Sequence, residues 1–323
     1  MLTCLEMMGY ESILAKLLSE QGLLLLDGGL ATELEAEGYD LDHPLWSFRL
    51  VAERPDAIVR VHGAYLEAGA DLIIASSYQG SIPGLVANGY SESEARELLG
   101  RSIDLAVNAR DAFWIKPENG LGNGRRKPLV GASIGPYGAY LADGSEYRGN
   151  YGLSRAAMHD FHAERFGIFA VSQADFIACE TLPGLSEGEV LAALAMQTDV
   201  PKTWLSFACR DGHFTCEGQP IAACAELVEA STGLIGLGIN CTAPQYVASL
   251  LRTVRATGFS KLLIVYPNSG EQFVLAHKSW SGDRDAVTFV QLAREWAALG
   301  AQIIGGCCRT GPGHICALRI AFP

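Results

Sequence analysis

Charged residues are scarce in this sequence, and basic residues are scarcer than acidic ones. Only 19% of the 323 residues are charged, with 24 Lys and Arg against 36 Asp and Glu, and the formal net charge is −12. A field of this sign repels nucleic acids and anionic membrane surfaces, so we expect neither as a partner. It is compatible with a cationic ligand but does not by itself establish one.

Features of export and of disulfide bonding are absent as well. The N-terminal segment carries the charged residues Glu6, Glu11, Lys16 and Glu20 before a short apolar run, Leu23–Leu26. A secretory signal has a basic start followed by a longer apolar core, so none is expected here. No stretch is long and apolar enough to span a bilayer. The nine cysteines are odd in number and irregularly spaced, which argues against a disulfide framework. We therefore expect a cytoplasmic protein, in which free thiols are more often structural, metal-binding or catalytic.

The sequence does contain a repeated alternation of short apolar runs and helical periods. The eight strand candidates are Leu23–Leu26, Asp71–Ala75, Pro128–Ile134, Asp175–Cys179, Thr203–Ala208, Leu234–Ile239, Lys261–Tyr266 and Gln302–Ile304. Strands that alternate with helices form parallel βαβ units. Eight such units predict an α/β fold, a single (β/α)8 TIM-type barrel with residues 1–323 as one domain. A doubly wound open sheet is the alternative that the pattern leaves open.

The helix after Pro55 illustrates the helical period. Proline suits the first turn of a helix, and Ile58, Val61, His62 and Tyr65 then recur on one face. His62 therefore belongs to an apolar helix face, and we interpret it as a packed, structural histidine.

Two other local patterns give further expectations. Ser91 with Glu94, and Ser186 with Glu189, have the spacing of a capping box at the start of a helix.

The segment 135–152 follows the third strand and is rich in glycine and tyrosine. Long structureless loops in compact domains are often functional, so we expect a lid over the active site there.

In a barrel of this type, the active site lies at the C-terminal ends of the strands. The polar or small residues at or just after these ends are therefore the candidates for function. They are Asp27, Ser76, Ser77, Ser133, Gly135, Glu180, Asn240, Cys241, Asn268, Cys307 and Cys308.

Three of these candidates are thiols, and two interpretations of them stay open on spacing alone. Cys241 follows the sixth strand, and Cys307 and Cys308 follow the eighth, so their loops can meet over the barrel mouth. Three thiolates suit a borderline-soft cation such as Zn2+, and a catalytic zinc keeps a further position open. Free cysteine is also a common small buried hydrophobe, which is how we interpret Cys179 and Cys316.

Five segments, in this order along the chain, resemble the homocysteine S-methyltransferase family. They are LLDGGLATELE (25–35), GASIGPYGAYL (131–141), DFIACETLP (175–183), GLGINCTAP (236–244) and GGCCRTGPGHI (305–315). The likeness is greatest to the short members of plant and bacterial type that use S-methylmethionine. The resemblance implies a (β/α)8 barrel whose zinc is held by one Cys after strand six and a Cys-Cys pair after strand eight. Those positions fall on Cys241, Cys307 and Cys308, which would also be the catalytic centre.

The resemblance also implies the residues that bind homocysteine. Glu180 matches the family position that accepts the substrate ammonium, and Asp27 matches a position near the same amino group. We expect the substrate carboxylate to meet backbone N–H groups at Ala132 and Ser133. Asn240 would orient the metal-binding loop that follows it.

Formal charge then bears on the methyl donor. Three thiolates with Zn2+ sum to about −1, and the thiolate of bound homocysteine makes this about −2. A cationic sulfonium donor, S-methylmethionine or S-adenosylmethionine, leaves as a neutral thioether and needs no general acid. Betaine is also cationic and stays as the alternative donor, although the family members that use betaine look longer than this chain. Trp46, Tyr78 and Tyr137 are candidates to face the cation.

Two other kinds of protein are weighed against this hypothesis. A metal-dependent hydrolase on a barrel uses His and carboxylate ligands, and no His-x-His follows the first strand. A non-catalytic zinc-binding barrel would need a fourth protein ligand, for which Cys209 and Cys216 are candidates. The sequence leaves open whether the protein is a monomer or a small homo-oligomer.

Overall fold

The computed structural model describes residues 13–119, 125–198, 202–274, 279–281 and 285–323, and its centre is an eight-stranded parallel sheet. The strands are β1 (Leu24–Leu25), β2 (Leu72–Ile74), β3 (Leu129–Ile134), β4 (Phe176–Leu182), β5 (Thr203–Phe207), β6 (Leu234–Asn240), β7 (Leu262–Tyr266) and β10 (Ile303–Ile304). Their order is β1-β10-β7-β6-β5-β4-β3-β2, and a parallel bridge between Leu26 and Leu72 joins the two ends. The expected (β/α)8 barrel is confirmed.

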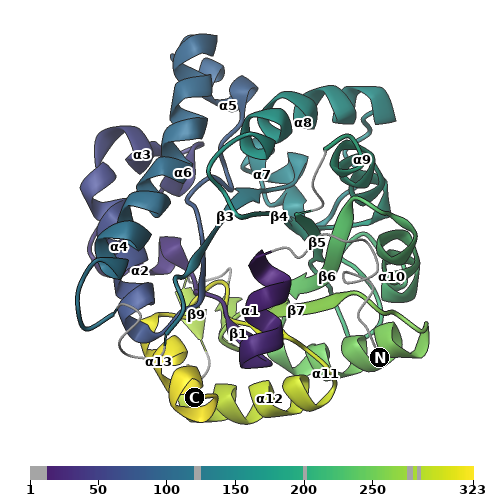
Figure 1. The fold of residues 1–323 in the computed structure, drawn as a ribbon. Helices are drawn as coiled ribbons and strands as arrows, with labels where there is room; N and C mark the ends of the chain where they lie inside the picture. The colour runs from purple at the N-terminus through teal and green to yellow at the C-terminus, as the bar shows by residue number, and fades with distance from the viewer. Residues whose placement is uncertain (1–12, 120–124, 199–201, 275–278, 282–284) are drawn as a thin grey trace.

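Eight helices form a ring around this sheet, each packed against the next (Figure 1). They are α4 (Pro55–Ala68), α6 (Glu92–Trp114), α8 (Arg155–Ala170), α9 (Leu185–Ala195), α10 (Ile221–Ala230), α11 (Pro244–Ala256), α12 (Ala286–Ala298) and α13 (Pro312–Ala321). Shorter elements carry the remaining turns: α1 (Ile13–Gln21), α2 (Leu30–Ala36), η2 (Trp46–Phe48), α3 (Arg49–Glu53), α5 (Ile82–Ala87), α7 (Tyr137–Leu141) and η4 (Ser145–Tyr147). Among the described helices, none combines the length and hydrophobicity required of a membrane span.

The join between β1 and β2 is reinforced by a buried carboxylate. Asp71 accepts a hydrogen bond from the Leu25 amide at 2.9 Å and one from the Arg319 guanidinium of α13. Its own amide donates to the Leu25 carbonyl at 2.7 Å. Helix α13 is thus attached to the seam at which the barrel closes.

Side chains fill the barrel, and a helix covers its lower end. Phe176 of β4 stacks on Trp204 of β5 with ring centroids 4.4 Å apart. Leu14, Leu17 and Leu18 of α1 belong to the same buried cluster, and α1 lies across the middle of the barrel in Figure 1. The interior is therefore a packed core, and the opposite end of the barrel is left for the site.

Some local expectations are confirmed and others are wrong. The capping box of Ser91 and Glu94 forms as expected. The one at Ser186 and Glu189 does not, because α9 begins one residue before Ser186, after Gly184, and has no side-chain cap. The segment 135–152 is not structureless, since it contains α7 and η4. The antiparallel pair β8 (Gln272–Val274) and β9 (Ser279–Ser281) was not predicted, because strands of this length carry little periodic information.

The interpretation of His62 generates a prediction about pH. Its side chain is fully buried on α4, neither ring nitrogen has a hydrogen-bond partner within the described residues, and burial lowers its pKa to about 4. The unfolded chain, with a His pKa near 6.5, therefore binds a proton that the folded state does not. Stability should fall as pH drops from about 6.5 toward 4, by up to about 3 kcal/mol from this group.

The variant His62→Phe removes this titration while keeping a ring of similar size. Urea unfolding at several pH values should show a shallower loss of stability for the variant than for the wild type between pH 6.5 and 4. His162, whose pKa is also lowered to about 4 by burial, retains its own contribution in both proteins. Identical slopes for the two proteins would contradict the assignment.

Candidate metal centre and substrate site

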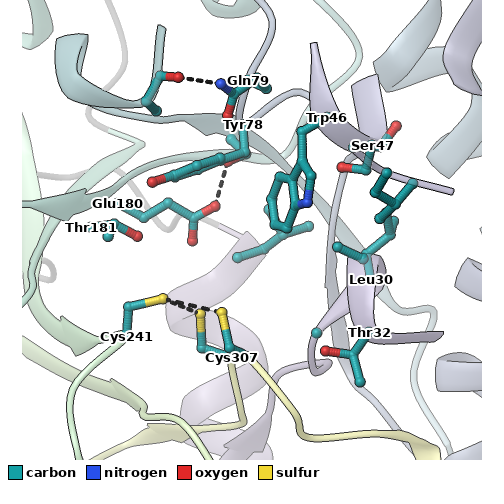
Figure 2. A pocket seen from close by; sticks show the side chains of 18 of the residues that line it. Leu30, Thr32, Trp46, Ser47, Tyr78, Gln79, Glu180, Thr181, Cys241 and Cys307 are labelled. Carbon is teal, nitrogen blue, oxygen red and sulfur yellow. Dashed lines mark hydrogen bonds between the residues drawn. The ribbon is translucent and has the colours of Figure 1, made fainter. Parts of the chain in front are cut away.

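Three cysteine sulfurs meet at the open end of the barrel (Figure 2). Cys241 follows β6, and Cys307 and Cys308 follow β10, with only β7 between these strands in the sheet. Cys241 Sγ lies 2.7 Å from Cys307 Sγ and 3.8 Å from Cys308 Sγ, and all three sulfurs fall within 4.8 Å of one another. Residues 66 positions apart are thus brought together by the topology expected from the sequence.

The surroundings of the sulfurs favour thiolate at one position. The thiols of Cys241 and Cys307 hydrogen-bond to Cys308, which holds the pKa of the Cys308 thiol well below its usual range. Tyr147 of η4 directs its hydroxyl at Cys241 Sγ from 3.7 Å. Among the described residues, no further His, Cys, Asp or Glu completes this group, and Cys209 is not a member of it. Such a set of three soft donors fits a zinc ion with an open position.

A cavity of about 610 Å³ opens above the sulfurs and has an acidic wall. Glu180, at the end of β4, is buried and accepts a hydrogen bond from the Ser133 hydroxyl. Burial raises the pKa of Glu180 to about 7, and the nearby Cys241 contributes to this rise. A carboxylate in this setting gains from a cationic partner, because an ammonium group offsets the cost of burying its charge.

Asp27 contributes to the same cavity and also to the barrel seam. It is buried, and its Oδ2 accepts a hydrogen bond from the Ile74 amide of β2 at 2.8 Å. Burial raises the pKa of its carboxyl group. The two glycines that follow allow close approach, since a Cβ on Gly28 would lie 2.6 Å from the Thr310 carbonyl and one on Gly29 2.7 Å from the Cys307 carbonyl. The Asp27 turn is therefore packed directly against the cysteine loop.

Ser133 and Asn240 occupy places that differ in part from those expected. The Ser133 amide, expected to meet the substrate carboxylate, donates instead to Ser77 Oγ at 2.9 Å, so this contact is not available. Asn240 is fully buried and does not line the cavity. Its side chain accepts from the Thr181 amide at 2.8 Å and donates to the Thr181 hydroxyl at 2.9 Å. It thereby holds Thr181, the neighbour of Glu180, at a positive φ of 61°.

Two of the three candidate aromatics line the cavity. Trp46 and Tyr78 both face it, and their rings meet edge-on with centroids 6.1 Å apart (Figure 2). Tyr137 does not line it and packs against Phe161 with centroids 4.8 Å apart, which places it in a cluster of rings outside the site. Sequence alternation locates a strand end but does not fix the direction of a side chain in the loop beyond it.

Other residues of the site were missed. Glu146 and Tyr147 line the cavity from η4, within the segment expected as a lid, and Arg309 lines it from inside the segment 305–315. The sequence singled out both segments but gave no role to these side chains. Their signal was position alone, next to a glycine-rich turn or to the cysteine pair.

A buried arginine holds two of the surrounding loops together. Arg165 of α8 donates to the Gly80 carbonyl at 3.0 Å and to the Gly135 carbonyl, and it contacts His162 at 2.8 Å. His162 in turn pairs with Glu187 of α9 at 2.8 Å. The loops after β2 and β3 are thus held by Arg165, whose side chain is in turn supported by a buried histidine and a buried carboxylate.

The comparisons with known proteins agree with this geometry. Residues 24–322 match the model of a family described as homocysteine S-methyltransferase. The chain belongs to this family. A homocysteine S-methyltransferase of Bacillus subtilis, YbgG, is 45% identical over 91% of this chain and 92% of its own. The Escherichia coli homocysteine S-methyltransferase is 41% identical over 97% of this chain and 99% of its own.

Solved structures of the Escherichia coli enzyme MmuM superpose closely on this family member. Its metallated form has a TM-score of 0.82 at 39% identity, covering 95% of this chain and 99% of the other. Its oxidised form has a TM-score of 0.83 at 40% identity, covering 94% and 97%. The protein is therefore an enzyme that transfers a methyl group to homocysteine, and neither a barrel hydrolase nor a non-catalytic barrel is favoured.

The position of Asn240 generates a prediction. Asn240→Ala removes two buried hydrogen bonds, one from the Thr181 amide and one to the Thr181 hydroxyl. We expect the free energy of unfolding to fall by about 2–3 kcal/mol, measured by urea unfolding. We also expect the KM for homocysteine to rise, because Glu180 adjoins the loosened residue.

Asn88→Ala provides the matched control for this variant. Asn88 makes one side-chain bond to the Gly84 carbonyl at 2.8 Å, and it does not line the cavity. Its substitution should leave the KM for homocysteine as in the wild type. An Asn240→Ala enzyme with unchanged KM would show that this side chain has no influence on the site.

Proposed function

We propose that this enzyme is zinc-dependent and transfers the methyl group of a sulfonium amino acid to homocysteine, giving methionine. The donor is S-methylmethionine or, as the second candidate, S-adenosylmethionine. The observation that carries the proposal is the group of three cysteine sulfurs at the floor of an acidic cavity. We further propose that residues 1–323 act as one barrel domain in the cytoplasm, as a monomer or small homo-oligomer.

The metal is assigned to Cys241, Cys307 and Cys308. Their chemistry supports zinc over magnesium or calcium, since thiolates are soft ligands and the group contains no carboxylate. When bound, zinc supplies thiol activation, because coordination favours the thiolate form of a thiol. The metallated form of the Escherichia coli enzyme is consistent with a metal at this place in the fold.

The protein side chains position the acceptor. Glu180, in its ionised form, is assigned to the ammonium group of homocysteine. The Ser133 hydroxyl orients the Glu180 carboxylate through a hydrogen bond. Asp27 adds a second acidic group within the same wall of the cavity. Both carboxyls are buried, so a bound ammonium interacts with them in a medium that screens charge poorly. Asn240 supports this arrangement through Thr181.

The charge of the cavity favours a cationic donor. The acidic wall and the sulfurs attract a sulfonium, and Trp46 and Tyr78 offer aromatic faces to it. Methyl transfer from a sulfonium to a thiolate neutralises charge, which a site poor in water favours. The departing thioether is neutral, so no general acid is needed. Betaine, which is also cationic, is the alternative donor.

The first test is substitution of the metal ligands. Cys241→Ser, Cys307→Ser and Cys308→Ser should each lose bound zinc and lower kcat/KM by more than about 100-fold, since loss of an outer partner of a metal site alone costs 10–100-fold. Zinc content is measured by atomic absorption and activity by methionine formation. A chelator should have the same effect on the wild type, reversed by added zinc.

Cys209→Ser and Cys216→Ser serve as controls for these ligand variants. Neither cysteine belongs to the group of converging sulfurs, so both variants should retain zinc and activity. If either lost zinc as completely as Cys307→Ser, the metal would have a fourth protein ligand, and the proposed open position would be wrong.

The second test concerns the acceptor. Glu180→Gln keeps the shape of the side chain and removes its charge. Loss of one charge-assisted hydrogen bond to the ammonium should raise the KM for homocysteine by about 10- to 100-fold. Zinc content and the KM for the donor should stay close to wild type. A raised donor KM with an unchanged homocysteine KM would assign Glu180 to the donor instead.

A direct donor assay completes the case. The purified zinc enzyme with homocysteine should form methionine from S-methylmethionine or S-adenosylmethionine. Turnover with betaine and with neither sulfonium would overturn the proposed donor class while leaving the metal assignment intact.

A further inference from the structure

The cavity has an uneven distribution of charge. Its described lining contains the carboxyl side chains of Asp27, Glu35, Asp42, Glu146 and Glu180. Arg309 is the one Lys or Arg among those described lining residues. Both substrates of the proposed reaction are amino acids, so each brings a carboxylate into a cavity whose other charged groups repel it. A single cation in such a place is the natural partner for one of these carboxylates.

The backbone of Arg309 is held in a fixed and unusual conformation. Its φ is 68°, in the left-handed region that non-glycine residues rarely occupy. The Arg309 amide donates to Thr32 Oγ1 of α2 at 2.9 Å. A conformation of this kind persists only where the surroundings determine it, and Arg309 in this conformation is one of the residues that line the cavity.

The side chain of Arg309 is oriented by the carboxylate of Glu271. Its Nε lies 3.1 Å from Glu271 Oε2, and the exposed fraction of the Glu271 side chain is only 8%. Glu271 also receives a bond from the Ser269 hydroxyl at 3.4 Å. A guanidinium is planar, so anchoring Nε fixes the plane in which its other nitrogens lie. The pair therefore sets the angle at which the guanidinium meets a ligand.

Arg309 and the proposed ammonium site belong to different parts of the barrel rim. Thr32, to which the Arg309 amide is bonded, lies in α2 after β1, whereas Glu180 lies near the C-terminal end of β4, three places around the closed barrel. In Figure 2 Thr32 lies to the right of Cys307, and Glu180 lies above it and to the left. Trp46, assigned to the donor, is on the Thr32 side in the same view. We therefore assign the Glu180 end of the cavity to the acceptor and the Arg309 end to the carboxylate of the donor.

We propose that Arg309 binds the α-carboxylate of the sulfonium amino-acid donor, an inference that rests on the proposed assignment of Glu180 to homocysteine. The ammonium and carboxylate of homocysteine are attached to the same carbon atom. With its ammonium at Glu180, the carboxylate of homocysteine stays on the β4 side. Arg309, which is attached to α2 and not to β4, is therefore matched to the other amino acid, whose sulfonium then faces the acceptor sulfur.

This role makes Arg309 a specificity-determining residue. In S-methylmethionine the carboxylate is separated from the cationic centre by a longer carbon chain than in betaine. A guanidinium held at a fixed place by Glu271 and Thr32 selects the donor whose carboxylate reaches it while the methyl group is at the sulfurs. A sulfonium without a carboxylate reaches the same methyl position but gains nothing from Arg309.

The test compares two donors with the zinc-loaded enzyme. One is S-methylmethionine, and the other is its decarboxylated analogue, aminopropyl-dimethylsulfonium. Arg309→Asn removes the charge, and asparagine tolerates a positive φ better than most residues. We expect kcat/KM for S-methylmethionine to fall by about 10- to 100-fold, as for loss of a charged hydrogen bond. The value for the analogue and the KM for homocysteine should stay close to wild type.

The ratio of the two kcat/KM values is the decisive quantity. Arg309 adjoins Cys308, but a loss of metal in a variant only reduces the active fraction, which lowers both values equally and leaves their ratio unchanged. Arg309→Lys, which keeps the charge without the planar fork, should give an intermediate ratio. Arg252→Asn, at an exposed ion pair with Glu295 on the helical ring, should give the wild-type ratio.

Two outcomes would overturn the inference in different ways. If Arg309→Asn raised the KM for homocysteine and left the donor ratio unchanged, Arg309 would bind the acceptor. If the ratio and the homocysteine KM both stayed at wild-type values, it would bind neither substrate. A wild-type enzyme that accepts neither sulfonium would instead refute the proposed function, which the same assay shows before any variant is made.

Discussion

Closure of the parallel sheet is the constraint on which the rest of this molecule depends. Only when β1 meets β2 do the C-terminal ends of all the strands face one cavity, and the join is made by the bridge from Leu26 to Leu72 and by the carboxylate of Asp71. The converging sulfurs and the acidic wall of the cavity all lie at that one rim. The packed interior below them supplies the rigidity that loops lack.

Backbone strain is concentrated at the same rim. Of the described residues other than glycine, six have positive φ, and five of these line the cavity: Trp46, Ala142, Thr181, Cys241 and Arg309. Such conformations cost about 1–3 kcal/mol each and persist only where the surroundings determine them. Asn240 does this for Thr181, and Thr32 does it for Arg309. The cavity is thus a place where stability is given up for the direction of particular side chains.

The features of this structure that depend on local sequence patterns could be predicted, whereas those that depend on contacts between distant segments could not. The eight strands could be predicted, because each is an apolar run followed by a helical period, although the pattern left an open sheet as the alternative to a closed barrel. The topology allowed Cys241 and Cys307 to meet, and the family resemblance implied that they do. The direction of Tyr137 and the buried network of Arg165 could not be predicted, since both are decided by contacts between segments far apart in sequence. An arginine within a helix gives no local sign that it will be buried.

Asp27 contributes both to barrel closure and to the cavity wall, and this double contribution has a consequence for the evolution of the barrel. One oxygen of its carboxylate accepts a hydrogen bond that connects the end of β1 to β2, while the residue also forms part of the cavity wall. Chemical change and folding are therefore not separable at this position. A lineage that acquires a different acceptor is more free to alter residues such as Glu146, on the η4 segment, than the aspartate at the seam. Innovation in this architecture should begin in its loops and reach the first strand last.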